Sequence, residues 1–96
     1  LTKEILHAKT GMEAVELCKI NTDINLILMD IKMPVMDGYE ATRRIREFNK
    51  DVKIVAQTAY AYVSDREQAL KVGCNDYVAK PINREHIIHV VGKQFE

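Results

Sequence analysis

The sequence predicts an α/β fold built around a parallel β-sheet. Short apolar segments alternate along the chain with longer segments in which apolar residues recur at helical spacing. Residues 26–29 are four consecutive apolar residues, which is typical of a strand buried on both faces. Strands that alternate with helices pair in parallel through right-handed crossovers. We therefore expect four strands and four helices around one sheet.

The first half of the chain contains two strand–helix units. Residues 4–8 are predicted to form a short strand, and Thr10 and Glu13 have the spacing of a helix-capping box. The helix that follows is expected to present one apolar stripe, made of Met12, Val15, Cys18 and Ile20. Residues 26–29 form the second predicted strand, and Asp37 opens a second helix. The apolar face of this helix is expected to carry Ala41, Ile45 and Phe48.

The second half of the chain repeats this arrangement. Residues 53–58 are the third predicted strand, and residues 64–67 open a third helix that ends at Gly73. Two residues of this helix are expected to face inward, Ala69 and Leu70. Residues 76–79 are the last predicted strand, and Asn83 is the expected N-cap of the final helix. The apolar residues of that helix are Ile87, Ile88, Val91 and Phe95.

Length and composition indicate a single small domain that spans residues 1–96. The fourteen basic and fourteen acidic residues cancel, so no global field favours nucleic acid or an anionic membrane. No apolar run has the length of a membrane span, and no signal peptide is visible. Cys18 and Cys74 lack the pattern of a disulfide framework or a metal site, so we expect two buried free thiols in a reducing cytoplasm.

Three predicted strands end in residues that are chemically useful. The second strand is followed by Asp30, the third ends in Thr58, and the last is followed by Lys80 and Pro81. If the strands are parallel, these three ends lie at one edge of the sheet, where open α/β sheets bind their ligands. A carboxylate can attack phosphorus, an ammonium group offsets the phosphoryl charge, and a hydroxyl hydrogen-bonds the product. The set therefore favours acyl-phosphate chemistry.

These residues lie in motifs that resemble the receiver domain of two-component response regulators and hybrid histidine kinases. Residues 30–34 and 36–38 resemble its phosphorylation-site signature, and residues 58–59 resemble its switch hydroxyl and small neighbour. Residues 80–81 resemble its lysine–proline pair, and Tyr77 matches its aromatic switch position. The resemblance implies a flavodoxin-like, doubly wound parallel sheet that is incomplete at its N-terminal end.

The resemblance also implies a function and a set of site residues. Asp30 would accept a phosphoryl group from a phosphohistidine, with Lys80 and Thr58 as its catalytic neighbours. Thr58 and Tyr77 would form the switch, and Mg²⁺ would be held by Asp30 and by the backbone carbonyl of Lys32. The partners would be a histidine kinase or phosphotransfer protein and an effector domain or protein, and a homodimer is compatible with the family. The domain would modify its own aspartate and would not be an enzyme for a separate substrate, and it would contact neither nucleic acid nor membrane directly.

The sequence departs from this family at its beginning. The family's first β/α unit, with an acidic pair that binds the metal, has no counterpart here, so the Mg²⁺ site is incomplete. In the family, the missing strand would lie between residues 4–8 and 26–29, and its absence predicts unpaired backbone at the centre of the sheet. These segments could pair directly or with another chain. The interpretation favoured by the sequence is that the chain is a portion of a longer protein.

Two other classes of function are compatible with parts of the pattern. A receiver-like interaction module that is not phosphorylated fits the missing acidic pair, and a small flavin-binding domain fits the topology but lacks the expected phosphate loop. Two clusters are expected to have no special role. The first is a short basic run made of Arg43, Arg44 and Arg46. It is expected to be a solvated helix face, with a docking patch as the alternative. The second is the set of three histidines, which does not suggest a metal site and consists of His7, His86 and His89.

Overall fold

The computed structural model describes residues 4–8, 10–31, 36–58, 63–79 and 83–95. Strands and helices alternate in these residues, as predicted. The strands are β1 (Ile5–Ala8), β2 (Leu26–Asp30), β3 (Lys53–Thr58) and β4 (Asp76–Ala79). The helices are α1 (Gly11–Ile20), α2 (Gly38–Phe48), α3 (Val63–Val72) and α4 (Arg84–Lys93). The predicted strands are confirmed, and no boundary differs from the prediction by more than one residue.

The four strands form one parallel sheet in the order β1-β2-β3-β4. β1 pairs directly with β2, with Ile5 opposite Leu26 and Ala8 opposite Met29. The gap expected at the centre of the sheet is therefore closed in this structure, and direct pairing is the arrangement adopted. It satisfies backbone groups of β2 that would otherwise be buried without partners.

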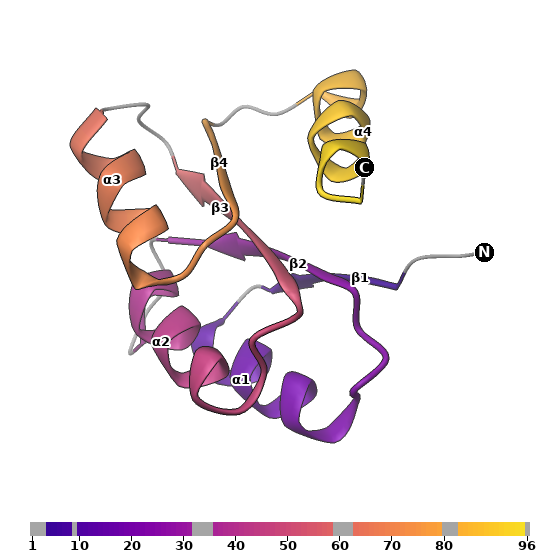
Figure 1. The fold of residues 1–96 in the computed structure, drawn as a ribbon, viewed down its shortest axis with the longest axis vertical. Helices are drawn as coiled ribbons and strands as arrows, with labels where there is room; N and C mark the ends of the chain where they lie inside the picture. The colour runs from indigo at the N-terminus through magenta and orange to yellow at the C-terminus, as the bar shows by residue number, and fades with distance from the viewer. Residues whose placement is uncertain (1–3, 9, 32–35, 59–62, 80–82, 96) are drawn as a thin grey trace.

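The sequential strand order determines where the helices lie. Right-handed crossovers between successive neighbouring strands all pass over the same side of a sheet. Accordingly, α1, α2 and α3 lie together on one side of the sheet and α4 lies on the other (Figure 1). Both faces of the sheet are covered, as expected for a doubly wound fold.

Strand β2 demonstrates how the sheet is buried between these helices. Ile27 and Met29 belong to the larger core under α1, α2 and α3, whereas Leu26 and Leu28 belong to the smaller core under α4. All four side chains are buried, which confirms the prediction of a strand buried on both faces. Successive side chains point to opposite faces of a strand, so a continuous apolar run serves two cores at once.

Three helices begin at the predicted capping residues. The side chain of Thr10 accepts a hydrogen bond from the backbone N–H of Glu13, and Asp37 accepts one from Glu40. Asn83 accepts the equivalent bond from the N–H of His86 at 2.7 Å. The remaining helix, α3, differs slightly from the prediction. It begins at Val63, one residue before the segment expected to open it.

The C-terminal end of α3 is formed as predicted by a glycine. Gly73 has a φ of 118°, in the region that only glycine adopts readily. The N–H of Gly73 donates to the carbonyl of Leu70, and the N–H of Cys74 donates to that of Ala69. These bonds close the helix and direct the chain into β4.

Several apolar residues that were expected to be buried are exposed. Ile20 is 81% exposed and Ile88 is 60% exposed, and the others are Met12, Phe48 and Leu70. A helix packed on a sheet buries only a narrow stripe, and residues about a quarter turn away from it remain in solvent. In α4 the buried position is Val90, which the prediction omitted. Val15, Cys18, Ala41, Ile45 and Ala69 are buried as expected.

Both cysteines are free and buried, as the sequence predicted. Burial raises the pKa of the Cys18 thiol and of the Cys74 thiol, because the thiolate is poorly solvated in the core. The hydroxyl of Thr42, 3.7 Å from Cys74 Sγ, and the guanidinium of Arg46 oppose this shift at Cys74 without reversing it. At neutral pH both side chains are therefore protonated core residues.

Removal of the Asp37 cap should destabilise the protein. Its carboxylate accepts from the N–H of Glu40 at 2.9 Å, so Asp37→Ala leaves a donor of the first turn of α2 without this partner. We expect the free energy of unfolding to fall by about 1 kcal/mol in urea titrations. Asp23→Ala, at an exposed position outside the helices, is the control and should change it by less than about 0.5 kcal/mol. Equal effects of the two substitutions would contradict the capping role.

Candidate functional site

The carboxyl ends of three strands lie together at one edge of the sheet. Asp30, the last residue of β2, is in register with Gln57 of β3, and Thr58 is in register with Ala79 of β4. The convergence expected from parallel pairing is therefore confirmed for the ends of these strands. Lys80 and Pro81 follow β4 directly, but they lie outside the described residues, as does Lys32.

Asp30 lies at the rim of the sheet on a firmly held backbone. Its side chain is partly exposed, while the next residue, Ile31, is buried in the larger core. The N–H of Ile31 donates to the carbonyl of Gln57 at 3.0 Å, so the pairing with β3 continues one residue beyond the strand. A carboxylate in this position is open to solvent and to a ligand, but its main chain has little freedom to move.

Thr58 and Tyr77 lie near each other on the same face of the sheet. Thr58 shares its face of β3 with Ile54 and Ala56, because side chains alternate along a strand. Tyr77 is opposite Ala56 in the register, which places it diagonal to Thr58. Thr58 is buried, and Tyr77 is partly buried against the larger core. The structure therefore brings the two predicted switch residues together at the edge that also carries Asp30.

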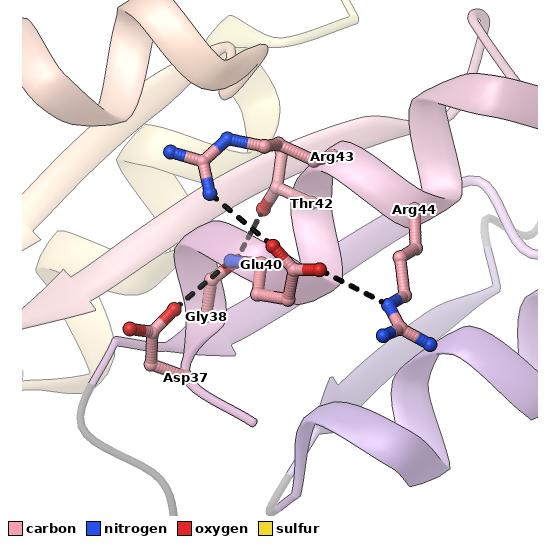
Figure 2. A network of polar contacts seen from close by, with 6 residues as sticks. All are labelled: Asp37, Gly38, Glu40, Thr42, Arg43 and Arg44. Carbon is pink, nitrogen blue, oxygen red and sulfur yellow. Dashed lines mark hydrogen bonds and ion pairs between the residues drawn. The ribbon is translucent and has the colours of Figure 1, made fainter. Parts of the chain in front are cut away.

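The first turn of α2 packs against the segment that follows Asp30. The N–H of Gly38 donates to the carbonyl of Ile31 at 3.0 Å. Figure 2 shows the polar contacts around this turn, where Glu40 pairs with Arg43 at 3.3 Å and with Arg44 at 3.2 Å. These two ion pairs are exposed, so each contributes only a few tenths of a kcal/mol.

The basic run was expected to be solvated throughout, and for Arg46 this prediction is wrong. Arg43 and Arg44 are exposed, but Arg46 is partly buried and binds the turns around it. Its guanidinium donates to four oxygens: Gly73 O at 3.0 Å, Asn49 O at 3.2 Å, Val52 O at 2.8 Å and Asn75 Oδ1 at 2.9 Å. Burial lowers the pKa of Arg46, while Cys74, Asp51 and Cys18 oppose the shift. Arg46 is two residues from Arg44, so it points to a different side of α2, and it is three residues from Arg43, so it lies beside it.

Two residues near Asp30 were not assigned a role at the site from the sequence. Gln57 is a buried polar residue directly across from Asp30, and the signal for it is a polar residue near the end of an apolar strand. Gly38 closely approaches the backbone of Asp30. Gly38 was part of the recognised signature, but its contact with Asp30, eight residues earlier in the chain, becomes visible only in the folded structure.

The described residues form no clustered metal site with Asp30. Among the described residues there is no group of three or more His, Cys, Asp or Glu side chains that could hold a metal ion. A single carboxylate is nevertheless a suitable Mg²⁺ ligand, because Mg²⁺ often takes one or two carboxylates and completes its shell with water and phosphate oxygens. In the part of the chain that the structure describes, no helix is long and apolar enough to cross a membrane.

Comparison with known proteins identifies relatives of this chain. The family profile of the response regulator receiver domain matches residues 2–92. Hybrid signal transduction histidine kinase B of Dictyostelium discoideum is 43% identical over 94 residues, covering 84% of this chain and 5% of the kinase. The chain thus spans only a small part of such relatives.

Two solved structures are also similar. The receiver domain of a sensor histidine kinase from Pseudomonas aeruginosa PAO1, with a magnesium ion coordinated in its active-site cleft, has a TM-score of 0.84 and 31% identity, and the match covers 98% of each chain. A receiver domain of a Saccharomyces cerevisiae response regulator, crystallised with the histidine phosphotransfer protein upstream of it, has a TM-score of 0.76 and 39% identity. That match covers 91% of this chain and 65% of the yeast chain.

Proposed function

This chain belongs to the family of response regulator receiver domains, and on that basis we propose that residues 1–96 form one receiver domain in which Asp30 accepts the phosphoryl group. The observation that carries this assignment is the position of Asp30. It is a partly exposed carboxylate on a fixed backbone, at the edge where β2, β3 and β4 end together. Asp76, the other acidic residue of β2–β4, begins β4 and is in register with Val55, so it does not lie at the carboxyl end of a strand.

The proposed reaction is phosphoryl transfer between two side chains. A carboxylate oxygen of Asp30 attacks the phosphorus of a phosphohistidine, a P–O bond forms, and the P–N bond to the donor breaks. The electron pair of that bond stays on the imidazole nitrogen, which takes up a proton from solvent. The product is an acyl phosphate on Asp30, and water later hydrolyses it.

Neighbouring groups would offset the charge of the transferred group. We assign Lys80, which follows β4, to the phosphoryl oxygens or to the Asp30 carboxylate, and Thr58 to a hydrogen bond with the phosphoryl group. Asp30 and the backbone carbonyl of Lys32 would hold Mg²⁺. The ion, when bound, supplies positive charge to the phosphoryl oxygens. With one carboxylate assigned to it, this site should bind Mg²⁺ weakly.

The proposed output is a shift between two arrangements of the Thr58–Tyr77 pair. A phosphoryl group on Asp30 would draw the hydroxyl of Thr58 toward it, and the Tyr77 ring would move into the space that Thr58 leaves. The surface formed by α3, β4 and α4 would then bind an effector domain or protein differently. The diagonal placement of the two residues on one face supports this coupling.

The proposed phosphodonor is a histidine kinase or a histidine phosphotransfer protein. The yeast relative was crystallised with a protein of the latter kind, and the kinases among the relatives carry their receiver segments in much longer chains. We also propose a cytoplasmic location, because two buried free thiols suit a reducing compartment.

Beryllofluoride, which mimics a phosphoryl group on a carboxylate, tests the proposed function directly. With Mg²⁺ present, we expect bound fluoride resonances in fluorine NMR spectra of the wild-type protein, and none for Asp30→Asn. The bound signal should also disappear when Mg²⁺ is chelated. If the wild-type protein is folded and shows no bound signal at any Mg²⁺ concentration, the domain is instead an interaction module that works without phosphorylation.

A further inference from the structure

Gly38 lies against the backbone of Asp30 more closely than any other residue type would allow. A Cβ atom at position 38 would be 2.5 Å from the carbonyl oxygen of Asp30 and 2.9 Å from Cα of Ile31. Both neighbours are main-chain atoms, so no change of rotamer can relieve the overlap. Gly38 has no positive φ in this structure, so its importance lies in the space it leaves and not in its conformational freedom.

Hydrogen bonds stabilise the contact between Gly38 and Asp30 on the β2 side and on the α2 side. The N–H of Gly38 donates to Ile31 O, and the N–H of Ile31 in turn donates to Gln57 O, each at 3.0 Å. On the helix side, the buried hydroxyl of Thr42 donates to the carbonyl of Gly38 at 2.7 Å (Figure 2). The start of α2, the end of β2 and the adjacent β3 therefore form one connected unit.

We propose that Gly38 is a positioning residue for the phosphoacceptor. This role rests on the proposed function of Asp30. Because Gly38 has no side chain, α2 packs directly on the Asp30–Ile31 peptide and determines where the Asp30 carboxylate leaves the sheet. Any side chain at position 38 would push that peptide or α2 aside. A nucleophile displaced by about 1 Å reacts on the order of 100-fold more slowly, although it is chemically unchanged.

The chain offers two matched controls for this proposal. Gly11 also begins a helix, and a Cβ there would be 2.5 Å from the carbonyl oxygen of Met36, an overlap of the same severity with the main chain of a residue other than Asp30 and Ile31. A Cβ at Gly92 in α4 would meet no atom within 4 Å. We would label the wild-type protein and the Gly38→Ala, Gly11→Ala and Gly92→Ala variants with radioactive acetyl phosphate at one fixed concentration. The first-order rate constant and the final labelled fraction are measured separately, and circular dichroism gives the folded fraction.

The expected result is a slower rate constant for Gly38→Ala alone, by about 10- to 100-fold, with the other two variants within about twofold of the wild type. A purely structural role would lower the labelled fraction of Gly38→Ala in step with its folded fraction and leave the rate constant unchanged, which would overturn the proposal. An equal slowing in Gly11→Ala would also overturn it. Absence of label on wild-type Asp30 would instead refute the proposed function itself.

Thr42 variants keep the proposal testable if Gly38→Ala does not fold. Thr42→Val keeps the shape of the side chain but loses the hydroxyl that holds the carbonyl of Gly38, and Thr42→Ser retains that hydroxyl. We expect the labelling rate constant to fall by about threefold or more in folded Thr42→Val, since the carbonyl of Gly38 loses the donor that holds it, and to be restored in Thr42→Ser. Equal rate constants in the two folded variants would contradict a positioning role for the start of α2.

Discussion

Replacement of Asp30 with asparagine is expected to reduce phosphoryl incorporation from acetyl phosphate to background, by at least about a thousandfold. The carboxamide has nearly the same shape as the carboxylate but is not a nucleophilic anion. Asp30 lies at the partly exposed end of β2, so the substitution should leave the fold intact. The measurement is the initial rate of radiolabel incorporation, with circular dichroism as the check on folding.

The control for this experiment is a nearby aspartate with a different role. Asp37→Asn removes a charge seven residues away in the same signature, and asparagine caps a helix about as well as aspartate. We expect Asp37→Asn to be labelled within about twofold of the wild type. Comparable loss of label in both variants, or persistent label in Asp30→Asn, would show that Asp30 is not the acceptor.

Replacement of Arg46 with methionine is expected to lower the free energy of unfolding by about 2–4 kcal/mol. The guanidinium donates to three carbonyl oxygens and to the side chain of Asn75, and methionine can satisfy none of them. Asn75 Oδ1 also accepts from the N–H of Ile54 at 2.9 Å, so Arg46 links α2 to β3 and to the turn before β4. Loss of the guanidinium leaves partly buried acceptors short of a donor, and a missing partner of this kind is destabilising.

The neighbouring arginines provide the comparison for Arg46. Arg43→Met and Arg44→Met remove only exposed ion pairs with Glu40, so each should change the free energy of unfolding by less than about 0.5 kcal/mol. Urea titrations of the three variants under the same conditions measure the difference. Similar values for all three would mean that the contacts of Arg46 contribute little to stability.

Local patterns in the sequence were sufficient to predict the elements of this fold. Strand limits were predicted to within one residue, because apolar runs, alternation and turn residues act over only a few positions. Thr10, Asp37 and Asn83 were recognised as caps for the same reason, since a cap bonds to an amide three residues away. Burial of single helical residues was less predictable, as Ile20 and Ile88 demonstrate. The buried side of a helix depends on which neighbours cover it.

The sequence by itself determined the alternation of strands and helices, and with it the gathering of Asp30 and Thr58 at one edge of a parallel sheet. This gathering follows from the parallel topology alone, because the carboxyl ends of parallel strands lie at the same edge of a sheet. Only the tertiary structure decided that β1 pairs directly with β2, that Arg46 turns inward, and that Gly38 lies against Asp30. These features depend on contacts between segments that are distant along the chain or separated by a loop. Their energies come from packing and from hydrogen-bond partners that no local pattern specifies.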